Sequence, residues 1–131
     1  MSAIRPNKAQ FIELMEAPDE GPVVMLNLLR YADTANDGSG RTGREAYQHY
    51  GELVIPMLEA RGAGFIVYAT AEQTVIGPAD EEWDEMILVQ YPSRAAFIDM
   101  ITSADYLAAH VHREAGLADS RLVATTRIDG A

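Results

Sequence analysis

Two of the three histidines, His110 and His112, lie one residue apart in "HVHREAGL", in a chain without cysteine. A histidine can bind a metal or act as a general base near neutral pH. Side chains at i and i+2 share a face on a strand, where they could chelate, but on a helix they diverge by roughly 200°. The apolar residues around the histidines keep helical spacing: Leu107, Val111 and Ala115. We therefore predict a helix that ends near Gly116, with no two-histidine chelate and with His110 alone placed to serve a pocket.

Asn27 is the second candidate catalytic residue, because it interrupts the apolar run "VVMLNLL". A buried carboxamide is costly unless its donors and acceptors are paired. It either bonds to the backbone at a bulge or sheet edge, or donates a hydrogen bond to a substrate carbonyl or enolate. The sequence leaves both interpretations open.

Four further residues are candidate substrate-binding residues, and each has a structural alternative. Trp83, the single tryptophan, is either an interface anchor or a pocket wall. Arg113 could hold a substrate carboxylate, or it could pair with Glu114 or Asp119. Tyr50 and Tyr68 are expected to be core residues. If a pocket exists, one of their hydroxyls could face it.

Metal ligation is not expected. In "REAYQHYGEL" the single histidine, His49, has no second histidine four residues away, as a zinc-binding helix would require. No phosphate-binding loop is present either. We predict no metal and no bound organic cofactor.

The elements that would position these residues follow from hydrophobic spacing. Helical periodicity appears over residues 7–17, 44–61 and 92–116, with Ser103 as a possible cap inside the last range. Apolar, partly β-branched runs predict strands over 23–30, 64–77, 83–91 and 120–128. After an extra N-terminal helix, the order is strand, helix, strand, strand, helix, strand. This order predicts one α+β domain over residues 1–131, ferredoxin-like, with a four-stranded antiparallel sheet.

Right-handed crossovers place both helices of such a fold on one face of the sheet, so the other face is uncovered. Runs such as "VVMLNLL" and "MILV" make that face apolar, and it must be buried somewhere. A homodimer is the simplest burial. The polar, glycine-rich stretch over residues 32–43 is expected to be a mobile loop and a candidate lid.

Charge and hydropathy limit the partners. Twenty acidic against ten basic residues give a net charge of −10, which repels phosphate backbones and anionic membrane surfaces. No apolar run approaches the roughly 18 residues that span a bilayer, and "MSAIRPNKAQF" lacks a signal core. We expect a cytoplasmic protein with neither nucleic-acid nor membrane partners.

Four blocks carry a family resemblance: "PVVMLNLLRY", "IPMLEARGAGFIVY", "WDEMILVQYPSRAAFIDM" and "HREAGLADSRLVAT". In this order and spacing they resemble the family called domain of unknown function 1330, over about residues 21–126. The family belongs to the dimeric α/β-barrel superfamily, so the resemblance implies a homodimer whose two sheets pack into a barrel. It implies no activity. Neighbouring families include cofactor-independent monooxygenases, haem-degrading monooxygenases and small-molecule isomerases, in many of which a ligand sits between sheet and helices.

Three classes of function therefore stay open. The chain is a small-molecule enzyme working by acid/base or oxyanion-type catalysis around Asn27 and His110, a ligand-binding dimer without turnover, or a structural dimer whose barrel is filled by side chains. A weaker alternative is haem binding or degradation, because Asn27, Trp83 and His110 match the residue types that the haem-degrading relatives use.

Overall fold

The computed structural model describes residues 3–128. The elements are α1 (Lys8–Glu16), β1 (Val23–Tyr31), α2 (Gly43–Ala60), β2 (Gly64–Thr70), β3 (Glu85–Tyr91), α3 (Arg94–Ile101), α4 (Ala104–Gly116) and β4 (Leu117–Thr125).

Polar caps begin every helix. The side chain of Asn7 accepts from the backbone N–H of Gln10 at α1, and Thr42 forms the equivalent capping box with Glu45 at α2. Ser93 and Ser103 cap α3 and α4. The predicted helical region over 92–116 is therefore two helices, with Ser103 at the break, as its sequence indicated.

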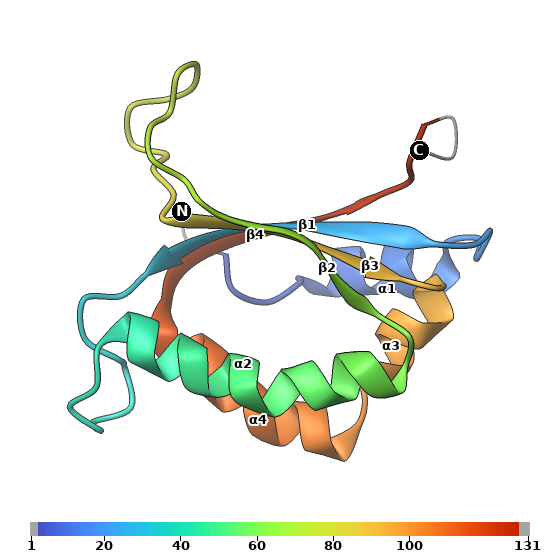
Figure 1. The fold of residues 1–131 in the computed structure, drawn as a ribbon, viewed down its shortest axis with the longest axis horizontal. Coiled ribbons are helices and arrows are strands. Elements are labelled where there is room, and N and C mark those ends of the chain that lie inside the picture. The colour runs from blue at the N-terminus through green and yellow to red at the C-terminus, as the bar shows by residue number, and fades with distance from the viewer. Residues whose placement is uncertain (1–2, 129–131) are drawn as a thin grey trace.

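The four strands form one sheet in the order β2-β3-β1-β4, and every neighbouring pair is antiparallel. Because β1 and β3 are central, the two crossovers through α2 and through α3 and α4 return the chain to one face of the sheet. Figure 1 shows α2 and α4 side by side below the sheet, with α1 under the same face. This is the predicted ferredoxin-like arrangement.

Strand alternation divides the side chains between two faces. On β1, Val23, Met25 and Leu29 point to the helices and are 1%, 2% and 0% exposed. Their neighbours on β3, Ile87 and Val89, point the same way. These residues pack against aromatic side chains of the helices, and the resulting core fixes the distance between the sheet and α2 and α4.

The opposite face, which we call the outer face, has no helix over it (Figure 1). Alternation and register place these apolar residues there: Leu26, Leu28, Val67, Met86, Leu88 and Val123. All are partly or largely exposed in the isolated chain. The predicted uncovered apolar face is present.

Several strand boundaries differ from the prediction. β2 ends at Thr70, so residues 71–84 form a loop that rises from the sheet in Figure 1. β3 begins at Glu85, two residues after Trp83. β4 runs from Leu117 to Thr125, three residues earlier than predicted at both ends, and follows α4 directly. At the junction, a Cβ on Gly116 would strike the Gly43 carbonyl, so only glycine fits there.

The loop over residues 32–42 is tied down at its base. The backbone N–H of Ala32 donates to Gly116 at 2.9 Å, and that of Asn36 donates to Ala115 at 2.8 Å. Thr34 and Thr42 also form a backbone bridge. These bonds hold the base of the loop at the C-terminal end of α4, and the mobility of its remainder stays a prediction.

Within residues 3–128, no helix is both long and apolar enough to cross a membrane.

Candidate functional site

A cavity of about 1270 Å³ lies between the sheet and its helical layer. The inner faces of the strands form one wall, α2 and α4 form the second, and the N-terminal segment with α1 closes part of the third. Five of the six residues predicted from the sequence line it: Asn27, Tyr50, Tyr68, His110 and Arg113. Elements distant in sequence thus bring the candidates to one space.

His110 is on the cavity wall and its side chain is 19% exposed. Its Nδ1 is 3.3 Å from Oε1 of Glu114, one helical turn along α4. Burial lowers the pKa of His110, and the nearby positive charge of Arg113 lowers it further, while Glu114 opposes both. His110 is therefore neutral at pH 7. With Nδ1–H directed to Glu114, the lone pair of Nε2 is left to accept a proton.

Arg113 is a buried cation, 7% exposed, that also lines the cavity. Nη1 donates to the backbone carbonyl of Ile4 at 2.6 Å, and Nη2 reaches Oγ of Ser120 at 3.5 Å. Neither of the two acidic residues that the sequence suggested as partners forms an ion pair with Arg113. Glu114 pairs with Arg5 and His110, and Asp119 pairs with Arg121.

Asn27 faces the helices, between Met25 and Leu29 of the core. Its Nδ2 donates to the carbonyls of Met25 and Ile87, at 3.3 and 3.4 Å. The Nδ2 group of Asn27 therefore bonds to the backbone, as one of the two interpretations required, and these two bonds use both of its N–H groups. Asn27 therefore presents Oδ1, an acceptor, to the cavity instead of the donor that the oxyanion hypothesis required.

Two tyrosine hydroxyls on the wall are already engaged. The hydroxyl of Tyr50 is 2.9 Å from that of Tyr106, and burial raises the pKa of Tyr50 well above its usual value. Tyr68, which is half-exposed, donates to Glu85 at 2.9 Å, and its pKa is also raised by burial. Both are neutral at physiological pH and can act as hydrogen-bond partners.

Glu85 was not among the predicted residues. It is 7% exposed and accepts from the hydroxyls of Tyr31 and Tyr68, while Arg44 pairs with it from α2. The sequence signal that could have identified Glu85 is its place in the alternating run "EMILVQY", where it occupies a position that faces inward. It holds Tyr68 in place at the edge of the cavity.

Trp83 is not on the cavity wall. Its ring lies 5.7 Å from the guanidinium of Arg30 and 5.0 Å from that of Arg121, at the start of β3. Arg30 also holds the loop before β3, donating to the carbonyls of Glu82 and Asp80 at 2.8 and 3.0 Å. Alternation along β1 puts Arg30 on the outer face. The expectation that Trp83 is a pocket wall is therefore not met, and its role as an interface anchor stays a prediction.

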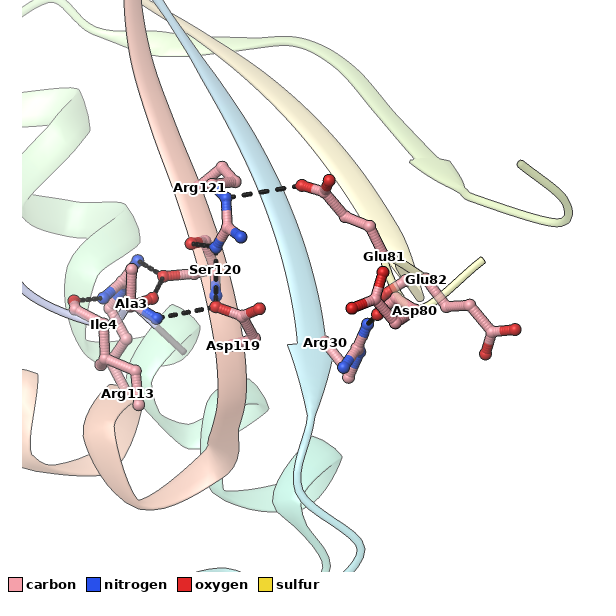
Figure 2. Close-up of polar contacts among 10 residues, drawn as sticks. All are labelled: Ala3, Ile4, Arg30, Asp80, Glu81, Glu82, Arg113, Asp119, Ser120 and Arg121. Carbon is pink, nitrogen blue, oxygen red and sulfur yellow. Dashed lines mark hydrogen bonds and ion pairs between the residues drawn. The ribbon is translucent and has the colours of Figure 1, made fainter. Parts of the chain in front are cut away.

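The N-terminal segment was also missed as part of the site. The backbone N–H of Ala3 donates to Asp119 at 2.7 Å, and Ser120 donates to the carbonyl of Ala3. Arg5 pairs with Glu114. Figure 2 shows the contacts of Ala3 with Asp119 and Ser120, together with Arg113, on one side of β4, and Glu81 with Arg121 on the other. A sequence offers no local signal for contacts made across more than 100 residues.

The other two histidines meet elsewhere. The rings of His49 and His112 are 4.4 Å apart, edge to face, and Arg41 lies 3.3 Å from Nδ1 of His112. His112 does not line the cavity, in agreement with the helical spacing, and the side chain of His49 is 41% exposed. Residues 32–43 do not line the cavity, which gives no support to a lid role for that loop. Over residues 3–128, no group of three potential metal ligands occurs.

Comparison with known proteins gives a family match and a similar solved structure. The family model for domain of unknown function 1330 matches residues 41–126. A solved protein of unknown function from Rhodopseudomonas palustris is 38% identical, with a TM-score of 0.92, and the match covers 98% of this chain and 99% of that one. The chain belongs to the DUF1330 family. The family match begins after "MLNLLR", which therefore lies outside it.

Two more distant structures share the fold. A dimeric ferredoxin-like protein of unknown function from Thermobifida fusca is 17% identical with a TM-score of 0.51, over 82% of this chain and 92% of that one. A protein from Caulobacter crescentus, described as a candidate antibiotic biosynthesis monooxygenase, is 13% identical with a TM-score of 0.51, over 84% and 92%. No curated protein matches the chain. At these identities the two structures support the DUF1330 fold alone.

Proposed function

We propose that this DUF1330 protein is a homodimer that binds a small molecule with a largely apolar body in the cavity between sheet and helices, with His110 as a general base. The convergence of Asn27, Tyr50, Tyr68, His110 and Arg113 on one cavity carries the proposal. Ligand sites are typically concave, mostly apolar and furnished with a few convergent polar groups.

The general-base role rests on the pair formed by His110 and Glu114. Glu114 orients the imidazole through Nδ1, and the lowered pKa keeps Nε2 unprotonated near neutral pH. A proton taken from the ligand would move to Nε2, and Arg113 is close enough in the helix to stabilise the negative charge left on the ligand. The C. crescentus neighbour described as a monooxygenase is compatible with catalysis in this fold.

Dimerisation is proposed from the outer face. Its apolar side chains have no cover within the chain, and a solved relative with this fold is described as dimeric. Burying that face against a second copy removes apolar surface from water. We also propose that the protein is cytoplasmic.

A ligand-binding dimer without turnover is the second candidate. The same cavity supports it, and in that case Glu114 only holds His110 in place. The haem alternative gains no support from the geometry, because Trp83 stands outside the cavity that Asn27 and His110 share.

Native mass spectrometry of gently purified protein, followed by denaturation to weigh what is released, tests the proposal. We expect a dimer carrying a discrete small molecule. His110→Ala should then abolish any turnover of that molecule while leaving its binding within a few-fold. Turnover that is unchanged in His110→Ala would remove the base assignment, and unchanged turnover with intact binding in every site variant would leave a different site to be found.

A further inference from the structure

We infer that the cavity takes an organic monocarboxylate whose carboxylate group binds Arg113. This inference rests on the proposed function, since it names the ligand class of the same cavity. It concerns recognition, and it holds for an enzyme and for a binding protein alike.

The first argument is the state of the Arg113 charge. Arg113 is 7% exposed, and the two hydrogen-bond acceptors of its guanidinium, the Ile4 carbonyl and the Ser120 hydroxyl, are both neutral. Among residues 3–128, no carboxylate forms an ion pair with it. A buried charge without a counter-charge is strongly unfavourable. An anion supplied by a ligand would provide what the chain does not.

The second argument is that the neighbouring carboxylates are already committed. Glu114, next in sequence, pairs with Arg5 through one oxygen and with His110 through the other. Asp119 accepts from Arg121 at 2.8 Å and from the backbone of Ala3 at 2.7 Å. Neutralising Arg113 with either carboxylate would break these contacts, so neither is available to pair with Arg113.

The third argument concerns donors and charge number. A guanidinium has five N–H groups, and the two bonds present leave three to donate. Its planar fork matches the two oxygens of a carboxylate. The other arginines on the wall are less suited, since Arg5 and Arg121 are ion-paired and Arg94 is only half-buried. One buried cation in a chain of net charge −10 favours a monoanion over a doubly charged phosphate.

The rest of the ligand is defined by the apolar wall. Phe11 and Leu14 of α1 and Val54 of α2 line the cavity together with inward residues of β4. A volume of about 1270 Å³ exceeds the roughly 300–1,000 Å³ typical of small-molecule pockets, so an aryl or medium-chain alkyl body fits. The unused Oδ1 of Asn27 would accept from a hydroxyl or N–H on that body.

Isothermal titration at pH 7.5 with two matched pairs of probes tests the inference: decanoate against decanol, and 2-naphthoate against 2-naphthamide. In the wild type, each carboxylate should bind about tenfold tighter than its neutral partner, which is the range of a charge-assisted hydrogen bond. Arg113→Met should remove this preference, and Arg113→Lys should keep part of it. Arg61→Met, which removes an arginine that pairs with Asp99 away from the cavity, should keep all of it.

Each outcome has a distinct meaning. Equal binding of both members of each pair to the wild type would overturn the carboxylate inference and leave the apolar cavity standing. Binding of none of the four probes would overturn the proposed function itself. A carboxylate preference that survives in folded Arg113→Met would overturn the assignment to Arg113. If Arg113→Met does not fold by circular dichroism, the wild-type comparison and Arg113→Lys still decide.

Discussion

The guanidinium of Arg113 donates a 2.6 Å hydrogen bond to the carbonyl of Ile4, 109 positions earlier in the chain. This bond joins the centre of the cavity wall to the segment that leads into α1. At the other end of α1, Asp19 accepts from the backbone N–H groups of Arg94 and Ala95, at 3.0 and 3.2 Å. The helix between these anchors has no buried residue, so α1 closes the cavity with little packing of its own.

A first prediction concerns α1 as a closing element. Phe11 lines the cavity, whereas its neighbour Ile12 is 43% exposed and does not. Phe11→Ala should speed dissociation of a bound ligand about tenfold and change the free energy of unfolding by less than about 1 kcal/mol, since the helix is barely buried. Stopped-flow displacement and urea unfolding measure both quantities. Ile12→Ala is the control, and an equal acceleration in it would argue against a specific role for Phe11.

A second prediction separates Asn27 from the core around it. Asn27→Leu removes a carboxamide whose bonds are long, at 3.3 and 3.4 Å, and adds apolar volume, so the unfolding free energy should change by less than about 1.5 kcal/mol. Leu29→Ala, at a fully buried position, should cost about 2–5 kcal/mol. Urea unfolding of both variants checks this. A loss at Asn27→Leu as large as that of Leu29→Ala would make Asn27 a structural residue.

A third prediction is the pH dependence of stability. The pKa of His110 lies below its ordinary value of 6.5 in the folded chain, mainly because of burial. The unfolded chain therefore takes up the proton at higher pH than the folded chain, and stability falls as pH drops below about 6.5. His112, whose pKa is also lowered by burial, contributes with the same sign. Melting temperatures between pH 8 and pH 5 should decline less in His110→Gln than in the wild type, and identical curves would contradict the shift.

A fourth prediction concerns the outer face. Leu88→Asp places a charge at the centre of the sheet on that face, where a second copy would have to bury it, and it should convert the dimer to a monomer at micromolar concentration. Val111→Asp is the matched control, because Val111 is 55% exposed on α4, away from the sheet. Light scattering gives the mass directly. A wild-type monomer, or a dimer unaffected by Leu88→Asp, would place the interface elsewhere.

A fifth prediction contrasts two glycines of α2. A Cβ at Gly43 would lie 2.0 Å from the carbonyl oxygen of Ala32, whereas one at Gly51 meets nothing within 4 Å. Gly43→Ala should lower the unfolding free energy by about 1–3 kcal/mol, as overpacking does. Gly51→Ala should raise it by about 0.5–1 kcal/mol, because alanine favours the helix. Thermal and urea unfolding compare the two, and equal effects would mean that the contact at Gly43 relaxes freely.

The sequence by itself determined the order of elements and therefore the sheet. Apolar spacing, helix caps such as Asn7 and Ser103, and the crossover rule are local or topological signals, and together they allow essentially one antiparallel arrangement. The same spacing separated His110 from His112, because side-chain direction on a helix depends only on position along it.

Only the tertiary structure decided which groups remain without partners. Three such outcomes depend on contacts between distant segments. Arg113 bonds to Ile4 and not to Glu114 or Asp119. The N–H groups of Asn27 donate to carbonyls of β1 and β3, and Trp83 lies off the cavity. Each outcome results from competition among several polar groups that the fold brings close together. The spacing of residues along the sequence does not show which of these groups pair. The proposed carboxylate site depends on that competition, since Arg113 lacks an acidic partner because Glu114 and Asp119 are bound elsewhere.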